Sequence, residues 1–208
     1  MATVLDQLAS ASGQAKQDKN IALAHTIASA GDGTAVAELL AGLQHKTKAL
    51  RHDCIKTLYE IAALAPQLVS PHAAGLIHLL DSSDNRMQWG AMTALATLAE
   101  DIPAALFASL DKIMAVADNG SVITKDQAVR ILAVLSGKPE YAPTAIPLLL
   151  AQVLQAPLNQ APSYAEQALP VVDAAHRDQF KKILLTRIED TEQESKRKRL
   201  EKVLKKLK

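Results

Sequence analysis

Apolar residues recur along the chain in two ladders, and within each ladder the members lie mostly three or four positions apart. That spacing places them on one stripe of an α-helix. The first copy comprises Leu39, Leu40 and Leu43, followed by Cys54, Ile55, Leu58 and Ile61. Each copy is therefore predicted to form two amphipathic helices.

Both ladders recur downstream at a fixed interval, which is the signature of a helical-repeat array. A shift of 37 positions, as from Leu58 to Leu95, produces two further copies. The second copy is Leu76, Ile77, Leu80, Ala91, Met92, Leu95 and Leu98, and the third is Ile113, Met114, Ala117, Ala128, Val129, Leu132 and Leu135. A shift of 40 then predicts a last second helix with Ala168, Leu169, Val172 and Ala175.

Turn-forming residues separate the expected helices at matching places. The segment "AGDGT" at 30–34 is predicted to end one helix and begin the next, and "DSSDN" at 81–85 is a turn rich in capping residues. Pro66, Pro103 and Pro139 follow the second helix in three consecutive copies. A proline at this place is expected to stop that helix.

The pattern predicts one all-α domain over residues 1–208, a right-handed α-α superhelix of about five helix pairs. Its parts are an N-terminal capping hairpin at 1–33, repeats at 34–69, 70–106, 107–142 and 143–175, and a basic C-terminal capping hairpin at 176–208. A terminal repeat covers one neighbour and faces water on its other side, so charged residues are expected in these end hairpins.

Paired helices at intervals of 37 to 40 residues, together with the run "LLDSSDNRMQWGAMTAL", resemble the HEAT/armadillo-like family of helical repeats. In this run Met87 and Gln88 stand where the family usually has Val and Arg, whereas the preceding copy has the more typical Leu50 and Arg51. The resemblance extends over about residues 34–175. It implies a solenoid whose second helices line a concave binding face.

Composition agrees with a helical chain and indicates a cytoplasmic protein. Aromatic residues are only 3% of the sequence, whereas alanine and leucine, which favour helices, are abundant. Cys54 is the single cysteine, so an internal disulfide is excluded. The N-terminus lacks a basic region before an apolar run, and the most apolar segment, "APTAIPLLLAQVL", is shorter than a membrane span. No membrane span is expected, and a membrane is not the expected partner.

Charge is nearly balanced overall, with 23 basic and 22 acidic residues, but it is unevenly distributed. Residues 176–208 hold 12 Lys or Arg against 6 Asp or Glu, so the first 175 hold 11 against 16. The densest basic patch comprises Lys196, Arg197, Lys198, Arg199, Lys202, Lys205 and Lys206. A solvated capping helix is the favoured interpretation, and nucleic acid, an acidic protein or a membrane surface are the alternatives.

No pattern typical of catalysis, a cofactor or a metal occurs in the sequence. The six histidines lack the spacing of a zinc site. Cys54 follows His52 and Asp53, but adjacent helical positions point about 100° apart, so a buried, inert thiol is expected. No glycine-rich phosphate loop or nucleophile elbow is present. We therefore expect neither enzymatic activity, nor a cofactor, nor a small-molecule substrate.

The only tryptophan, Trp89, lies away from the core stripe of its predicted helix. Counting 100° per residue places Trp89 and Thr93 about opposite the buried positions of the second copy. The corresponding outward positions form a ladder of groove candidates: His52, Lys56, Tyr59, Trp89, Thr93, Thr97, Asp126, Arg130, Glu166 and Asp173. Trp89 is either a binding residue in this groove or part of the packing between repeats.

These observations favour a non-catalytic scaffold that binds a protein or peptide partner along its concave face. The runner-up is a nucleic-acid-binding repeat protein that uses the basic C-terminal helix. A third reading is an alkylated-DNA glycosylase of the helical-repeat type. That reading requires aromatic walls around an exposed base, whereas the six aromatic residues are mostly scattered one to a copy.

Overall fold

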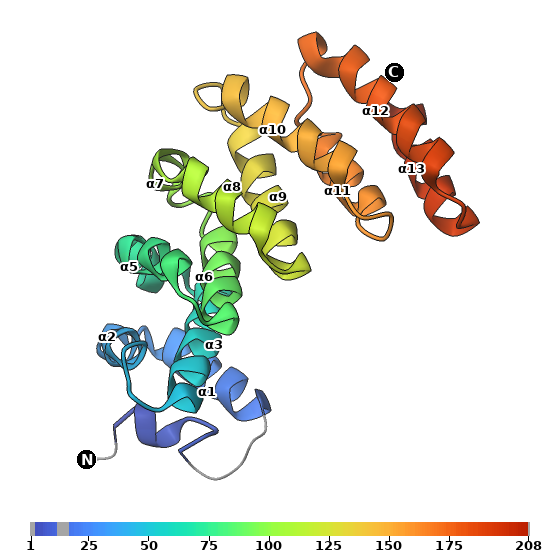
Figure 1. Ribbon diagram of the computed structural model, residues 1–208. Coiled ribbons are helices and arrows are strands. Elements are labelled where there is room, and N and C mark those ends of the chain that lie inside the picture. Colours follow the sequence, from blue (N-terminus) through green and yellow to red (C-terminus); the bar gives the residue numbers. More distant parts are fainter. Residues whose placement is uncertain (1–2, 12–16, 208) are drawn as a thin grey trace. The chain divides into compact units, whose positions relative to one another are not determined.

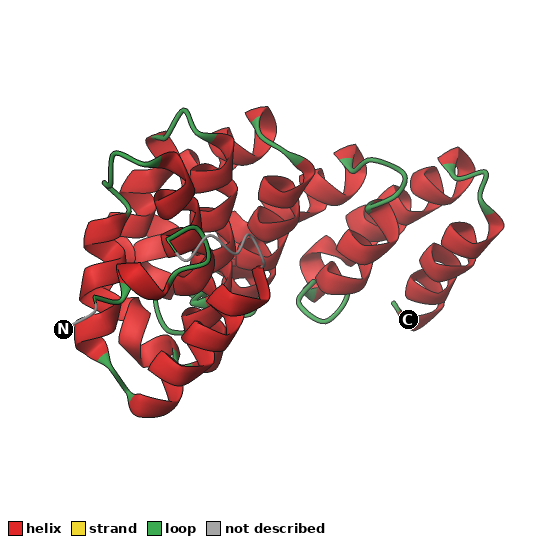
Figure 2. Cartoon of the chain, turned by 90° about the horizontal axis from the view of Figure 1, so that it is seen from below, coloured by secondary structure: helices red, strands yellow, loops and turns green. Residues whose placement is uncertain are grey.

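A computed structural model describes residues 3–11 and 17–207, which form helices and loops and no strand (Figures 1 and 2). The prediction of an all-α chain is confirmed for this part of the sequence. Internal contacts divide the chain into two compact units, Met1–Lys125 and Asp126–Lys208.

Unit 1 consists of short 3-10 turns (η) and α-helices in close succession. Its elements are η1 (Leu5–Gln7), α1 (Gln17–Ala30), α2 (Gly33–Gly42), α3 (Lys48–Leu64), α4 (Pro66–Val69), η2 (Ser70–His72), α5 (Ala73–His78), η3 (Leu79–Asp81), α6 (Asn85–Thr97), α7 (Pro103–Ala108), α8 (Leu110–Asn119) and the start of α9 (Val122–Ser136).

The helices of unit 1 stack in the manner expected of repeated pairs. Helix α2 packs on α3 and α5 packs on α6, while the second helices of consecutive pairs pack on one another in the order α1, α3, α6. In Figure 1, α2 and α5 accordingly lie on one side of this unit, and α3 and α6 form its adjoining row. The row α1–α3–α6 positions the candidate site.

The ladders become the core because their apolar stripes face these neighbouring helices. All four members of the second ladder are buried in each of the first three copies. Of the three members of the first ladder, the first and the last are buried in each copy. Burial of a leucine, isoleucine or valine side chain contributes about 1.5–3 kcal/mol each. The ladders therefore account for much of the stability of this stack.

The two predicted turns supply helix caps. In "AGDGT" the chain reverses at Gly31, whose φ of 62° suits glycine, and the carboxylate of Asp32 accepts from the backbone N–H of Ala35 at the start of α2. In "DSSDN" the Asp84 carboxylate accepts from the N–H of Arg86 at 3.1 Å. Both turns thus end one element and begin the next, as predicted.

Two of the repeated prolines follow one helix and also begin the next. Pro66 and Pro103 are the first residues of α4 and α7, where the missing N–H leaves no hydrogen bond unmade. Pro139 lies in the loop after α9. The expectation that these prolines only stop a helix was therefore incomplete.

The first arm of the expected N-terminal hairpin is the three-residue turn η1 and not a helix. Side chains of other helices accept its backbone N–H groups: Glu38 from Val4 at 2.9 Å, and Asp53 from Ser10 at 2.8 Å. Asn20 of α1 joins this network by donating to Asp53 at 2.8 Å. The turn η1 keeps its own local backbone bonds, and the Glu38 and Asp53 side chains hold the N–H groups on either side of it.

Unit 2 contains the rest of α9, α10 (Ala142–Gln155), α11 (Ala161–Ala168), η4 (Ala174–His176), α12 (Arg177–Asp190) and α13 (Glu194–Lys206). Two helix pairs stack here: α10 packs on α11 and α12 on α13, while α10 also packs on α12 and α11 on α13. Phe180, Leu184 and Leu200 are fully buried in this stack.

The predicted register of the last second helix is wrong. Helix α11 ends at Ala168, so Leu169 and Val172 lie outside it, half-buried, and Ala175 is exposed in η4. Pro170 contributes to the early end, because it has no backbone N–H to continue the helical hydrogen bonds. The buried residues Ala161, Ala165 and Ala168 instead repeat Ala128, Leu132 and Leu135 at a shift of 33.

Candidate functional site

Trp89 on α6 is less buried than the core stripe of the same helix. Met87, Ala91, Met92 and Leu95 of the same helix are buried, whereas Trp89 is half-buried. The Asp84 cap fixes where α6 begins, and thereby which residues face outward. The Trp89 side chain is therefore only partly exposed.

Close packing of α3 against α6 brings a second aromatic ring to Trp89. A Cβ on Gly90 would lie 2.7 Å from Cγ1 of Ile55, so the absence of a side chain at Gly90 permits this approach. The ring centres of Tyr59 and Trp89 are then 6.1 Å apart and the planes are inclined at 49°. This separation is within the range of a favourable aromatic pair.

Replacing Gly90 by alanine is expected to lower the free energy of unfolding by about 1–3 kcal/mol, because the new methyl group must displace Ile55 in a packed interface. Urea titration followed by circular dichroism measures this change. The matched control is Gly75→Ala on α5, where an added Cβ meets nothing within 4 Å. An equal or smaller loss for Gly90→Ala would contradict the close packing of α3 and α6.

Lys56 is held over the Tyr59 ring and does not extend into solvent. Its Nζ lies 4.7 Å from the ring centre, Glu60 pairs with it one turn later, and only 11% of its side chain is exposed. Burial lowers the pKa of Lys56, but the interactions with Glu60 and Tyr59 outweigh it and raise the pKa. Lys56 is therefore a cation that orients Tyr59.

Asp84 joins the beginnings of α3 and α6. Its carboxylate lies 2.9 Å from Nε2 of His52, 3.5 Å from Lys48 Nζ and 3.9 Å from Arg51 Nη2. Burial raises the pKa of Asp84, but the hydrogen bonds from His52 and from the backbone of Arg86 lower it further than burial raises it. The carboxylate thus stays ionised and anchors His52.

Thr93 and Thr97 use their hydroxyl groups within α6. Their Oγ1 atoms donate to the carbonyls of Trp89 and Thr93 at 2.8 and 2.9 Å. A hydroxyl that bonds back to its own helix has less capacity for an outside partner. The structure therefore places six groove candidates on α3 and α6 in unit 1, and Tyr59 and Trp89 are the aromatic residues among them.

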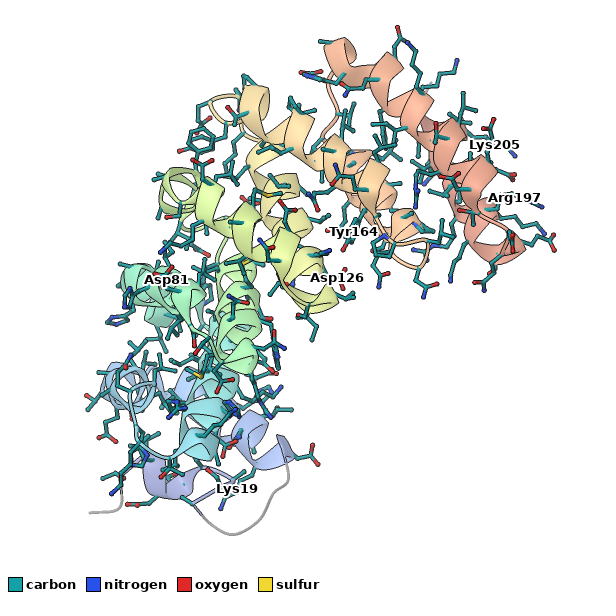
Figure 3. All side chains as sticks on the ribbon, viewed as in Figure 1. Lys19, Asp81, Asp126, Tyr164, Arg197 and Lys205 are labelled. Carbon is teal, nitrogen blue, oxygen red and sulfur yellow. The ribbon has the colours of Figure 1, made fainter. Side chains whose placement is uncertain are left out.

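The groove candidates of unit 2 mostly bind neighbouring side chains. Tyr164 donates to Asp126 at 2.6 Å, and burial together with that carboxylate raises the pKa of the tyrosine. Glu166 accepts from Nε and Nη2 of Arg199 at 2.9 and 2.6 Å. Figure 3 labels Asp126 and Tyr164. These contacts tie α9 to α11 and α11 to α13.

The two remaining candidates of unit 2 are more exposed. Arg130 projects from α9 with its Nη1 3.0 Å from the Gln127 side chain. Asp173 accepts from the backbone N–H of His176 at 3.0 Å, and its Oδ1 lies 2.7 Å from Nδ1 of the same histidine. Asp173 thus caps η4 and lies outside α11, so it does not continue the outward row of the second helices.

The sequence did not predict two residues that contact the groove candidates. Glu60 fixes Lys56, and Asp84 fixes His52. Glu60 stands four positions after Lys56, which is a signal for a helical ion pair. No such local signal connects His52 with Asp84, because their contact is between different repeats.

Among the described residues, no group of three or more His, Cys, Asp or Glu side chains is placed to hold a metal ion. No described helix combines the length and the apolarity needed to cross a bilayer. Cys54 is fully buried and does not share a cleft with His52.

No known family profile and no curated protein matches the sequence. Solved structures do match over nearly the whole chain. A designed armadillo repeat protein in complex with the peptide (KR)4 has a TM-score of 0.69 at 17% identity, over 99% of this chain and 98% of that one. The chain has the fold of the HEAT/armadillo-like helical repeats. It is thus an α-α superhelix of that kind, as predicted.

Two further structures of this fold are similar to the chain. A computationally designed armadillo repeat protein for modular peptide recognition has a TM-score of 0.65 at 16% identity, over 98% of each chain. The karyopherin Kap121p bound to the SUMO protease Ulp1p has a TM-score of 0.64 at 18% identity. That match covers 98% of this repeat chain but only 22% of Kap121p.

Proposed function

We propose that this helical-repeat chain is a non-catalytic scaffold that binds a protein or peptide partner on the outward face of its second helices. The observation that carries the proposal is the half-buried pair of Trp89 and Tyr59 on α6 and α3. Tryptophan and tyrosine are favoured interface anchors, because they bury a large area at little cost in conformational entropy.

The surroundings of the two rings support a preformed site. Lys56 and Glu60 restrain Tyr59 from one side, and His52 is anchored by Asp84 at the start of the same helices. Side chains that are already ordered lose little freedom when a partner binds, which favours affinity. Structural neighbours that are complexed with a peptide or bound to a protein agree with this use of the fold.

Replacing Trp89 by alanine is expected to weaken binding of the partner by about 2 kcal/mol, or roughly thirtyfold in Kd, as at an aromatic hot spot. The partner is first captured from the native host on the immobilised chain and identified by mass spectrometry. Its Kd for the wild-type chain and for Trp89→Ala is then measured by isothermal titration. In the same complex, iodide should quench Trp89 less than in the free chain.

The matched control is Tyr141→Ala, which removes a half-buried ring that stands at the start of α10 and is not part of a second helix. Its Kd should remain within about twofold of the wild-type value. Equal affinity of wild type and Trp89→Ala, or equal losses in both variants, would refute binding at the rings. Trp89→Ala should also lose less stability than a core leucine variant, because the indole is only half-buried.

A further inference from the structure

A hollow opens at one end of the last helix pair, where α12 begins and α13 ends. It measures about 420 Å³ and is lined by Arg177, Asp178, Lys181, Leu204, Lys205 and Leu207. The volume falls within the range of ligand pockets. Figure 3 labels Lys205 near this end of α13 and Arg197 toward its other end.

The basic residues in the first half of α13 are already paired. Lys196 is bonded to Asn159, Lys198 lies 2.7 Å from Glu194, and Arg199 makes two bonds to Glu166. Arg197 lies 3.9 Å from Glu201. The charge of this half is therefore largely compensated within the chain.

The cations around the hollow are different. The side chains of Arg177, Lys181 and Lys205 make no ion pair or hydrogen bond with the part of the chain that the structure describes, and Asp178 is the only acid among the lining residues. Three cations against one acid leave a net charge of +2 at its rim.

The interior of the hollow is apolar and not aromatic. Leu207 is 9% exposed and Leu204 is half-buried, so both present a methyl surface between the cations. A nucleic-acid strand would add affinity by stacking its bases on aromatic rings, and none lines the hollow. A ligand that fits both features carries carboxylates around an apolar side chain.

We propose that this hollow binds an acidic peptide segment of a partner protein, with an apolar side chain seated on Leu204 and Leu207 and its carboxylates facing Arg177, Lys181 and Lys205. The site lies on the last helix pair and does not depend on Trp89 or Tyr59. It would give the scaffold a second contact, which strengthens binding when both contacts belong to one partner.

The test measures fluorescence anisotropy of a short fluorescein-labelled peptide made of glutamate and glycine with one central leucine, titrated with the full chain. Lys205→Glu and Leu204→Ser should each raise its Kd about tenfold, since one removes a carboxylate partner and the other the apolar contact. Lys198→Glu is the matched control, because it changes the charge of the same helix equally but outside the hollow. It should change the Kd less than twofold.

Two further ligands test whether the hollow requires the apolar side chain and whether it prefers a peptide to a nucleic acid. A peptide with serine in place of its leucine should bind about tenfold more weakly to the wild-type chain. Oligothymidine should bind more weakly than the leucine peptide at physiological salt. Equal losses in Lys205→Glu and Lys198→Glu, equal binding of the two peptides, or tighter binding of oligothymidine would each overturn the proposal. Circular dichroism confirms that α13 is retained in every variant.

Discussion

Replacing Leu95 or Leu58 by alanine is expected to lower the free energy of unfolding by about 2–5 kcal/mol in each case. Leu58 on α3 and Leu95 on α6 correspond across one repeat interval, and both are fully buried. Removing either side chain loses its burial and leaves a cavity between packed helices. The expected cost is a large part of the stability of an ordinary domain.

The measurement is urea unfolding followed by the fluorescence of Trp89. This single tryptophan lies in unit 1 together with both leucines, so its signal reports that unit directly. Leu64→Ala is the control, because Leu64 stands at the end of the same α3 but is 44% exposed. It should cost less than about 1 kcal/mol. A similar loss for Leu58→Ala and Leu64→Ala would mean that the ladder is not the core.

The core of the first three copies could be predicted because its signal is local and repeated. Spacings of three and four define the buried stripe of a helix, and the 37-residue interval fixes the register across copies. The register of the last second helix could not be predicted in this way, because the loop "QAPLNQAPS" before it changes the interval between copies. Pro170 gave a correct local signal for the end of α11, but the apolar residues beyond it concealed the stop.

The candidate site could be predicted only in part, for a similar reason. The direction of Trp89 follows from its position on α6, which local geometry determines. Its contact with Tyr59 and the contact of His52 with Asp84 depend on how α3 packs against α6. That packing depends in turn on Gly90 meeting Ile55, which periodicity does not reveal.

The N-terminal segment shows the same limit. Its sequence "TVLDQLASA" has helix-forming residues, yet three of its backbone N–H groups donate to the side chains of Glu38, Asn20 and Asp53 on three other helices. Contacts between distant residues decide its conformation, because they satisfy the backbone groups that a helix would otherwise satisfy locally.

Cys54 is expected to react with a disulfide reagent about a thousandfold more slowly than an exposed cysteine at pH 8, because the thiolate is the reactive species. Burial raises the pKa of the Cys54 thiol to about 12, and the charge of Asp53 acts in the same direction. An ordinary thiol has a pKa of about 8.5. The thiol also packs closely at Gly42, where a Cβ would lie 2.5 Å from Sγ.

The reaction is followed with Ellman's reagent between pH 7 and 10. The matched control is the double variant Cys54→Ala/Ser83→Cys, which moves the single thiol to an exposed turn. Its rate should level off above about pH 8.5, whereas the rate of Cys54 should still be rising at pH 10. Unfolding in urea should remove the difference. Equal rates in the two folded proteins would place Cys54 in contact with solvent, and would reopen the question of a reactive thiol beside His52.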